Sequence, residues 1–238
     1  MPDAGERMRL HLAEVERRNA ATLDVVTERV HQTVIDDGLV ITTGTGHSVA
    51  MVLETFYRAG GLACVRPLIH PALLPLEGGL ASTHLERVAG LGRVLVEAAA
   101  PSPRDTAFVF SNSGINPVPV EMAVALQEAG TTVVAVSSVA HMSRAPARTQ
   151  PKLAEVADHV LDTAAPYGDA FIETPDGSIA ALSSLAGVYL WNLLLARLAV
   201  RAAEAGTRLP IWASANIAGG DVRNRNLIAR YRSRIPIL

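Results

Sequence analysis

Two short polar segments of the sequence combine glycine with hydroxyl and amide side chains. Segment 44–48 reads Gly-Thr-Gly-His-Ser, and segment 111–116 reads Ser-Asn-Ser-Gly-Ile-Asn. Each follows a predicted strand and opens a predicted helix, where unpaired backbone N–H groups and the positive end of the helix dipole attract anions. Glycine lets the backbone approach such an anion closely, and hydroxyl and amide groups donate further hydrogen bonds. The two segments therefore predict a phosphate-binding site.

The kind of phosphate is restricted by what the two segments lack. Neither contains the Gly-Lys-Ser/Thr pattern of nucleoside triphosphate sites, and segment 44–48 lacks the third glycine of the dinucleotide pattern. A phosphomonoester is therefore the expected ligand. Glycine, serine and asparagine are also ordinary turn and helix-cap residues, so one segment alone carries little weight. Two such segments on one sheet favour a ligand site, because ligands bind beyond the carboxyl ends of parallel strands.

The elements that must position these segments alternate between strands and helices. Short apolar, β-branched runs predict buried strands, and longer runs with helical spacing predict helices. Strands are expected at 39–43, 63–69, 106–110, 132–136 and 159–161, and helices at 6–37, 49–58, 83–99, 117–129, 153–157 and 178–205. Polar loops are expected at 137–151 and 164–177, and a basic helix near the end of 211–238. This alternation indicates an α/β fold with a parallel sheet between two layers of helices.

The composition excludes several other classes of protein. The chain has 238 residues, 49% of them apolar, and a net charge of −2, which allows a large core and gives no electrostatic case for binding nucleic acid. Cys64 is the only cysteine and the histidines lack metal-ligand spacing, so no disulfide, metal or cofactor is expected. The N-terminus lacks the apolar core of a signal peptide, and Asn192 and Arg197 interrupt the longest apolar run. A cytoplasmic protein without a membrane span is therefore expected.

Five motifs of the chain resemble those of the sugar isomerase (SIS) domain family. They are Gly-Thr-Gly-His-Ser at 44–48, Phe-Tyr-Arg-Ala-Gly-Gly-Leu at 56–62, Leu-Glu-Arg at 85–87, Ser-Ala-Asn at 214–216 and Gly-Gly-Asp at 219–221. Within that family the chain is similar to a branch related to phosphoheptose isomerase and N-acetylmuramic acid 6-phosphate etherase. The resemblance implies a three-layer αβα sandwich with a flavodoxin-like sheet of five parallel strands. Together with the helical spacing at 6–37, this predicts a long N-terminal helix at 1–37, packed on an SIS domain with a C-terminal extension at 38–238.

The resemblance further implies the binding residues and the partner. The residues expected to bind the phosphorylated sugar are Gly46, Ser48, Ser111, Asn112, Ser113 and Asn116. A homodimer is implied in which both subunits touch each site. Asn216 and Asp221, in a polar glycine-rich turn, are expected at the rim of the site or in the partner's site. The branch usually has an arginine where this chain has Ile115, which cannot pair with an anionic group, so substrate choice is expected to differ.

Glu86 and His47 are the candidate acid–base residues. Isomerisation and elimination of sugar phosphates both require removal of a proton beside a carbonyl and protonation of an oxygen. Glu86 is the expected base, because it lies at the start of predicted helix 83–99, where related SIS enzymes carry a catalytic glutamate. The alternative is that its carboxylate only stabilises the first turn of that helix. His47 is expected to open the sugar ring, act as an acid or contact the phosphate; the alternative is a local hydrogen bond to the backbone.

Three functions are compatible with these residues. The first is a lyase (dehydratase) that acts on an amino-sugar 6-phosphate, such as N-acetylglucosamine 6-phosphate, by removing the C2 proton and eliminating the C3 substituent. The second is an aldose–ketose isomerase, which needs the same proton abstraction but no leaving group. The third is a non-catalytic sugar-phosphate sensor. Ile115 favours the sensor, whereas Glu86 together with His47 favours an enzyme.

Overall fold

Five parallel strands form the central sheet of the chain. In the computed structural model, which describes residues 3–238, they lie in the order β2-β1-β3-β4-β5. Their bounds are β1 Val40–Gly44, β2 Val65–Pro67, β3 Thr106–Phe110, β4 Thr132–Ser137 and β5 His159–Asp162. Every neighbouring pair is parallel, so the carboxyl ends of the strands all lie at one edge of the sheet.

Both faces of the sheet are buried, as the side chains of β3 illustrate. Phe108 and Phe110 belong to one apolar cluster, and Ala107 and Val109 belong to another on the opposite face. Successive residues of a strand point to opposite faces, so each face receives every second side chain. Because both faces require apolar residues, the strands read as continuous apolar runs, which made them visible in the sequence.

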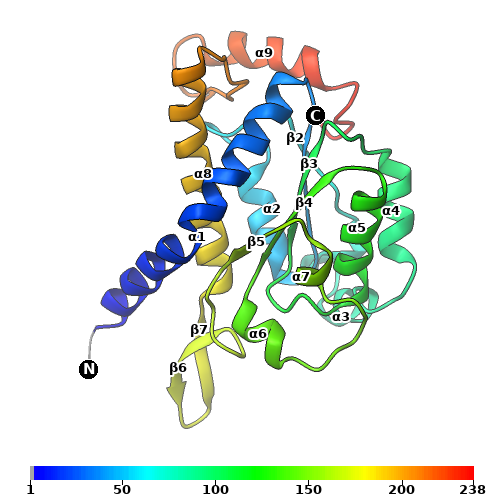
Figure 1. Ribbon diagram of the computed structural model, residues 1–238, viewed down its shortest axis with the longest axis vertical. Coiled ribbons are helices and arrows are strands. Elements are labelled where there is room, and N and C mark those ends of the chain that lie inside the picture. The colour runs from blue at the N-terminus through cyan, green and yellow to red at the C-terminus, as the bar shows by residue number, and fades with distance from the viewer. Residues whose placement is uncertain (1–2) are drawn as a thin grey trace.

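Helices cover both faces of the sheet and give the molecule three layers (Figure 1). The cluster around Phe108 contains residues of α1 Ala4–Ile35, α2 Val49–Thr55, α8 Ser183–Ala205 and α9 Gly220–Tyr231. The other face is covered by α4 Leu91–Ala99, α5 Pro117–Glu128 and α7 Leu153–Val156. The short helices α3 Gly79–Leu85 and α6 Val139–Arg144 lie at the carboxyl edge. The predicted three-layer sandwich, with a flavodoxin-like parallel sheet and a long N-terminal helix, is confirmed.

The two longest helices, α1 and α8, pack against each other. Leu23 and Val30 of α1 are buried in the same cluster as Leu194 and Leu198 of α8. Among residues 3–238, α8 is the one helix that is long and apolar enough, by length and composition alone, to cross a membrane. Its buried side lies against α1 and the sheet, which is the position of a core helix.

A β-hairpin occupies most of the region where a polar loop was expected, at 164–177. Its strands are β6 Ala170–Thr174 and β7 Gly177–Ala181, so α8 begins at Ser183 instead of residue 178. The sequence Thr-Pro-Asp-Gly forms the turn between the strands, and its proline and glycine favour such a tight turn. The Asp169 carboxylate accepts hydrogen bonds from the N–H and the hydroxyl of Ser183 at 2.8 and 2.6 Å, which fixes the start of α8.

The single helix expected at 83–99 is instead two helices, α3 and α4, joined by a turn. Gly90 has a φ of +89° at the N-terminus of α4, a backbone conformation that favours glycine. The Glu121 carboxylate of α5 accepts hydrogen bonds from the N–H groups of Gly90 at 2.8 Å and Gly92 at 3.1 Å. This cap from another helix satisfies the first N–H groups of α4, so a new helix begins where the local pattern predicts a continuous one.

Candidate functional site

The carboxyl edge of the sheet has a switch point between β1 and β3. Gly44 is the register partner of Phe110, so segments 44–48 and 111–116 begin side by side. The chain after β1 continues into α2 on one face, and the chain after β3 continues into α5 on the other face. Ligands of open parallel sheets bind at such points, because the diverging connections leave a crevice between them.

The first segment forms a single 3₁₀ turn, Gly46–Ser48, that leads into α2. Gly46 has a φ of +56°, and a Cβ atom there would lie 3.8 Å from Oε2 of Glu86. This left-handed conformation favours glycine and keeps the space beside the carboxylate open. His47 is exposed and Ser48 is half-buried, so both side chains are accessible to a ligand.

Glu86 connects the two segments. Its Oε2 accepts a hydrogen bond from the Thr45 hydroxyl at 2.7 Å, and its backbone carbonyl accepts one from the N–H of Val118 at 3.1 Å. The side chain is therefore held at the first segment, while the main chain is fixed to the first turn of α5. Glu86 caps the C-terminal end of α3, so the prediction that it begins a helix is wrong. A half-buried carboxylate at the switch point is nevertheless suited to removing a proton from a bound ligand.

The second segment folds around its own first residue. Ser111 is 6% exposed; its Oγ accepts a hydrogen bond from the N–H of Gly114 at 3.3 Å, and its carbonyl accepts one from the Ser137 hydroxyl at 2.7 Å. Gly114 has a φ of +62°, and a Cβ atom there would lie 2.5 Å from Sδ of Met142, so this position requires glycine. Ser111 thus shapes the turn, whereas the half-buried Ser113 is accessible to a ligand.

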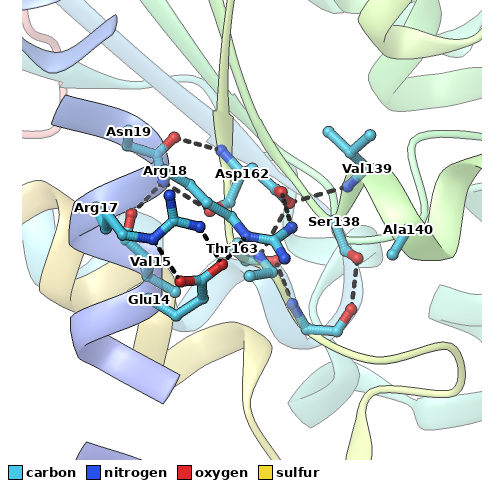
Figure 2. A network of polar contacts seen from close by, with 12 residues as sticks. Glu14, Val15, Arg17, Arg18, Asn19, Ser138, Val139, Ala140, Asp162 and Thr163 are labelled. Atoms are coloured by element: carbon cyan, nitrogen blue, oxygen red, sulfur yellow. Dashed lines mark hydrogen bonds and ion pairs between the residues drawn. The ribbon is translucent and has the colours of Figure 1, made fainter. Parts of the chain in front are cut away.

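A polar network that begins on α1 supports the second segment, and Figure 2 shows its part from Asn19 through Asp162 to Val139. Asn19 of α1 is 1% exposed and bonds to both backbone groups of Asp162, accepting from its N–H at 2.7 Å and donating to its carbonyl at 2.8 Å. The Asp162 carboxylate accepts a hydrogen bond from the N–H of Val139, where α6 begins. The Thr163 hydroxyl donates to Oδ1 of Asn112 at 3.1 Å. The oxygen of Asn112 is therefore engaged, and its amide N–H groups remain to donate to a ligand.

The N-terminus of α5 offers fewer donors than its position suggests. Pro117 and Pro119 have no backbone N–H, and the N–H of Val118 between them donates to the Glu86 carbonyl. The next N–H, of Val120, donates to the Asn116 carbonyl at 3.4 Å. The expectation that this helix start binds an anion through unpaired N–H groups is therefore wrong. Anion donors must come from the segment itself and from side chains.

Ile115 and Asn116 have different roles at the end of the second segment. Ile115 is 4% exposed and belongs to the apolar cluster that contains Met142 and Leu153, so its side chain fills the core. Asn116 is 7% exposed, and its Oδ1 accepts a hydrogen bond from Nη1 of Arg148 at 2.7 Å. A guanidinium from the loop between α6 and α7 therefore lies beside the second segment.

Asn216 and Asp221 lie far from Glu86 within one chain. The turn that contains Asn216 follows Trp212, whose backbone bonds to those of Gly60 and Gly61. These glycines precede β2 and so lie near the amino edge of the sheet. Figure 1 shows α9, which begins next to this turn, at the opposite end of the molecule from α3 and α6. Both polar side chains are exposed, and one chain does not bring them to the two segments.

Three residues of this site escaped prediction from the sequence: Thr45, Thr163 and Arg148. Their partners Glu86, Asn112 and Asn116 are 41, 51 and 32 positions away along the chain. Thr45 lies inside a predicted segment, so its hydroxyl was a usable signal. The other two lie in loops whose sequence has no local feature that identifies a partner across the fold.

Other reactive groups do not form a second centre in the described part of the chain. Within residues 3–238, no group of three or more His, Cys, Asp or Glu side chains is placed to hold a metal ion. Cys64 is buried, and burial raises the pKa of its thiol to about 12. A thiol with such a pKa is a poor nucleophile near neutral pH.

Comparisons with known proteins relate the chain to one family. The family model described as SIS domain matches residues 5–138. A UPF0309 protein of Geobacillus kaustophilus is 35% identical over 237 residues, which cover 98% of this chain and 94% of that protein. The structure of phosphoheptose isomerase from Neisseria gonorrhoeae is similar with a TM-score of 0.57 and 16% identity, covering 82% of this chain and 94% of that one. The sugar isomerase domain of an RpiR transcription factor from Sphaerobacter thermophilus has a TM-score of 0.53 and 16% identity, covering 97% and 98%. At such identities the two structures establish likeness of fold alone.

His141 on α6 joins this region to the base of the hairpin. Its Nδ1 accepts a hydrogen bond from the N–H of Gly168 at 3.2 Å, and its ring centroid lies 5.1 Å from that of Tyr167. Burial lowers the pKa of His141 below its ordinary value of 6.5. Protonation of Nδ1 would also remove the acceptor of this hydrogen bond.

We predict that the folded chain loses stability as the pH falls from about 7 to about 5, and that His141→Gln loses less. The unfolded chain takes up the proton of this histidine near pH 6.5, whereas the folded chain takes it up only at lower pH, so protonation favours unfolding over this range. Thermal unfolding of both proteins at both pH values measures the difference. An equal drop in melting temperature for the two proteins would contradict this role of His141.

Proposed function

Because the chain belongs to the UPF0309 family of SIS-domain proteins, we propose that it binds a phosphorylated sugar at the switch point and acts on it as an enzyme. The proposed substrate is an amino-sugar 6-phosphate, such as N-acetylglucosamine 6-phosphate. Its phosphate lies between the two segments and accepts hydrogen bonds from the hydroxyls of Ser48 and Ser113 and the amide of Asn112. Ser111 and Asn116 support the site without contacting the phosphate, because their side-chain oxygens already accept hydrogen bonds from the turn and from Arg148.

The position of Glu86 is the observation that carries this proposal. Its carboxylate is held by the Thr45 hydroxyl at 2.7 Å, against the open space that Gly46 leaves, between two segments rich in phosphate-binding groups. A base held in this way needs little reorganisation to meet a sugar whose phosphate is bound a few atoms away. A second hydrogen bond, from the N–H of Val118 to the Glu86 carbonyl, holds this base at a fixed position relative to the start of α5, directly after segment 111–116.

The proposed reaction is an elimination across C2 and C3 of the open-chain sugar. Glu86 takes the C2 proton, and the electron pair of that bond forms a C2–C3 double bond as the C3–O bond breaks. The departing oxygen takes a proton, and His47, exposed in the first segment, is the proposed donor. Water is the leaving group when C3 carries a hydroxyl, and lactate is the leaving group when C3 carries a lactyl ether.

Two alternatives share the same binding mode and differ in the product. An aldose–ketose isomerase would remove the same C2 proton but return a proton to C1. A sensor would bind the sugar phosphate without removing any proton. The identity of the product, and the isotope at C2, therefore distinguish the three functions.

We predict that incubation with N-acetylglucosamine 6-phosphate in deuterated water gives an unsaturated product or deuterium at C2. Glu86→Gln keeps the size of the side chain but removes the base, so the rate should fall by about a hundredfold or more. Proton NMR of the sugar follows both events. Glu77→Gln, the same change at an exposed position, is the matched control and should keep the wild-type rate.

Each other result changes the proposal in a defined way. A ketose formed from a sugar phosphate that carries a hydroxyl at C2 would replace elimination by isomerisation. Binding without exchange, unchanged in Glu86→Gln, would show a sensor. Weaker binding of the phosphorylated sugar by Ser113→Ala, with binding of the unphosphorylated sugar unaltered, would support the phosphate position. If no sugar phosphate binds, the proposed function fails.

We also propose that the chain forms a homodimer in which Asn216 and Asp221 of one subunit approach the site of the other. Both are exposed and remote from Glu86 in their own chain, and each is followed by an exposed apolar side chain, Ile217 at 56% and Val222 at 55%. Light scattering should give twice the chain mass of 25.1 kDa. Mixing inactive Glu86→Gln and Asn216→Ala subunits should restore part of the activity, because a mixed dimer has one intact site. A monomer in solution would contradict the shared site.

A further inference from the structure

The anion-binding side of the second segment lacks the donors that a helix start usually provides. At the start of α5, Pro117 and Pro119 have no N–H group, and the N–H of Val118 is bonded to Glu86. The phosphate of a sugar carries close to two negative charges near neutral pH, and hydroxyl and amide groups bring no charge to balance them. A cationic side chain near Asn116 would supply what this helix start lacks.

The loop between α6 and α7 places one guanidinium at this position. Nη1 of Arg148 donates to Oδ1 of Asn116 at 2.7 Å, which leaves the other N–H groups of the guanidinium available. Arg148 is exposed, and within residues 3–238 no carboxylate lies within salt-bridge distance of it. Nine ion pairs occur elsewhere in the described chain: seven are on arginines of α1, α4, α8 or α9, and two are on Arg58 and Arg234, which follow α2 and α9. Arg148 therefore has a neutral anchor and a charge that no carboxylate of the described residues pairs with.

The loop that carries Arg148 is bonded to the second segment where α7 begins, and a lysine closes the loop on itself. The N–H of Leu153 donates to the Gly114 carbonyl at 2.9 Å. Nζ of Lys152 donates to the carbonyls of Met142 at 2.7 Å and Ala145 at 3.2 Å, so this lysine closes the loop and is not directed at a ligand. These contacts join the two ends of the loop that carries Arg148 to each other and hold its C-terminal end against the second segment.

A neighbouring arginine is held differently. The Arg144 guanidinium, on α6, lies over the ring of Tyr167, 4.5 Å from its centroid. It is also exposed, and it belongs to the same region of the chain as Arg148. Arg144 therefore provides a matched comparison: an exposed cation nearby that is anchored on an aromatic ring and not on the second segment.

We propose that Arg148 binds the phosphate of the sugar and that Asn116 positions it. The proposal rests on the proposed function, because it adds a residue to the same site. Asn116, buried and engaged through its oxygen, holds the guanidinium beside the segment, and the remaining N–H groups of Arg148 donate to phosphate oxygens. Arginine presents its donors in a planar fork that matches a phosphate, so one side chain can supply both charge and direction.

The test measures the affinity of the full chain for N-acetylglucosamine 6-phosphate by calorimetry, at low and high salt. Arg148→Gln should weaken binding about tenfold to a hundredfold, whereas Arg144→Gln should change it by less than about twofold. Arg148→Lys should lie between wild type and Arg148→Gln, because lysine keeps the charge but not the fork. The wild type should lose affinity as salt rises, and Arg148→Gln should lose less, because its binding has one charge contact fewer.

The outcomes separate this inference from the proposed function. Wild-type affinity in Arg148→Gln, while wild type itself binds the sugar phosphate, would overturn the role of Arg148 and leave the proposed function standing. Equal losses in Arg148→Gln and Arg144→Gln, or an unchanged salt dependence, would also overturn it, because both would indicate a general effect of the loop. A wild-type chain that binds no sugar phosphate would overturn both proposals.

Discussion

The reversal of strand order between β1 and β3 is the constraint on which the rest of the site depends. Because β1 pairs with β2 on one side and β3 on the other, the chain leaves the two strand ends toward opposite faces. The crevice between the two segments follows directly from this topology. Glu86 spans the crevice, with its side chain on Thr45 and its carbonyl on Val118. One residue thus links the segment that contains His47 to the first turn of the helix that follows segment 111–116.

Helix α1, which lies away from the two segments, also determines the geometry of the site. Asn19 of α1 bonds to the backbone of Asp162 in the way a further strand would, which satisfies the edge of the sheet at β5. From there the contacts continue through Thr163 to Asn112 in the second segment. The long N-terminal helix is therefore part of the support of the site, as Figure 2 shows for its first steps. Binding groups held by such supports lose little freedom when a ligand binds.

The sequence predicted the parts of the structure that local patterns determine. Apolar β-branched runs identified β1, β3 and β4, because strands buried on both faces consist mainly of apolar and β-branched residues. The two glycine-rich segments were found because left-handed backbone at Gly46 and Gly114 restricts the residue type. The hairpin was missed although Thr-Pro-Asp-Gly at 174–177 is a strong turn signal, since the apolar residues after it were read as part of α8.

What the sequence could not predict depends on contacts between distant segments. The Glu121 carboxylate divides one expected helix into α3 and α4 and thereby moves Glu86 from a helix start to a helix end. Ile115 suggested a lost charge, yet its side chain fills the core, and a guanidinium reaches the second segment from Arg148 instead. No local pattern connects residues 116 and 148. The types of residue at the site were thus predictable, and the way in which charge reaches it was not.

The most direct test of the central claim is a crystal structure of the chain soaked with N-acetylglucosamine 6-phosphate. We expect the phosphate between segments 44–48 and 111–116, with its oxygens within hydrogen-bond distance of Ser48 and Ser113 and with C2 of the sugar next to the Glu86 carboxylate. A phosphate bound elsewhere, or a sugar bound with C2 turned away from Glu86, would contradict it.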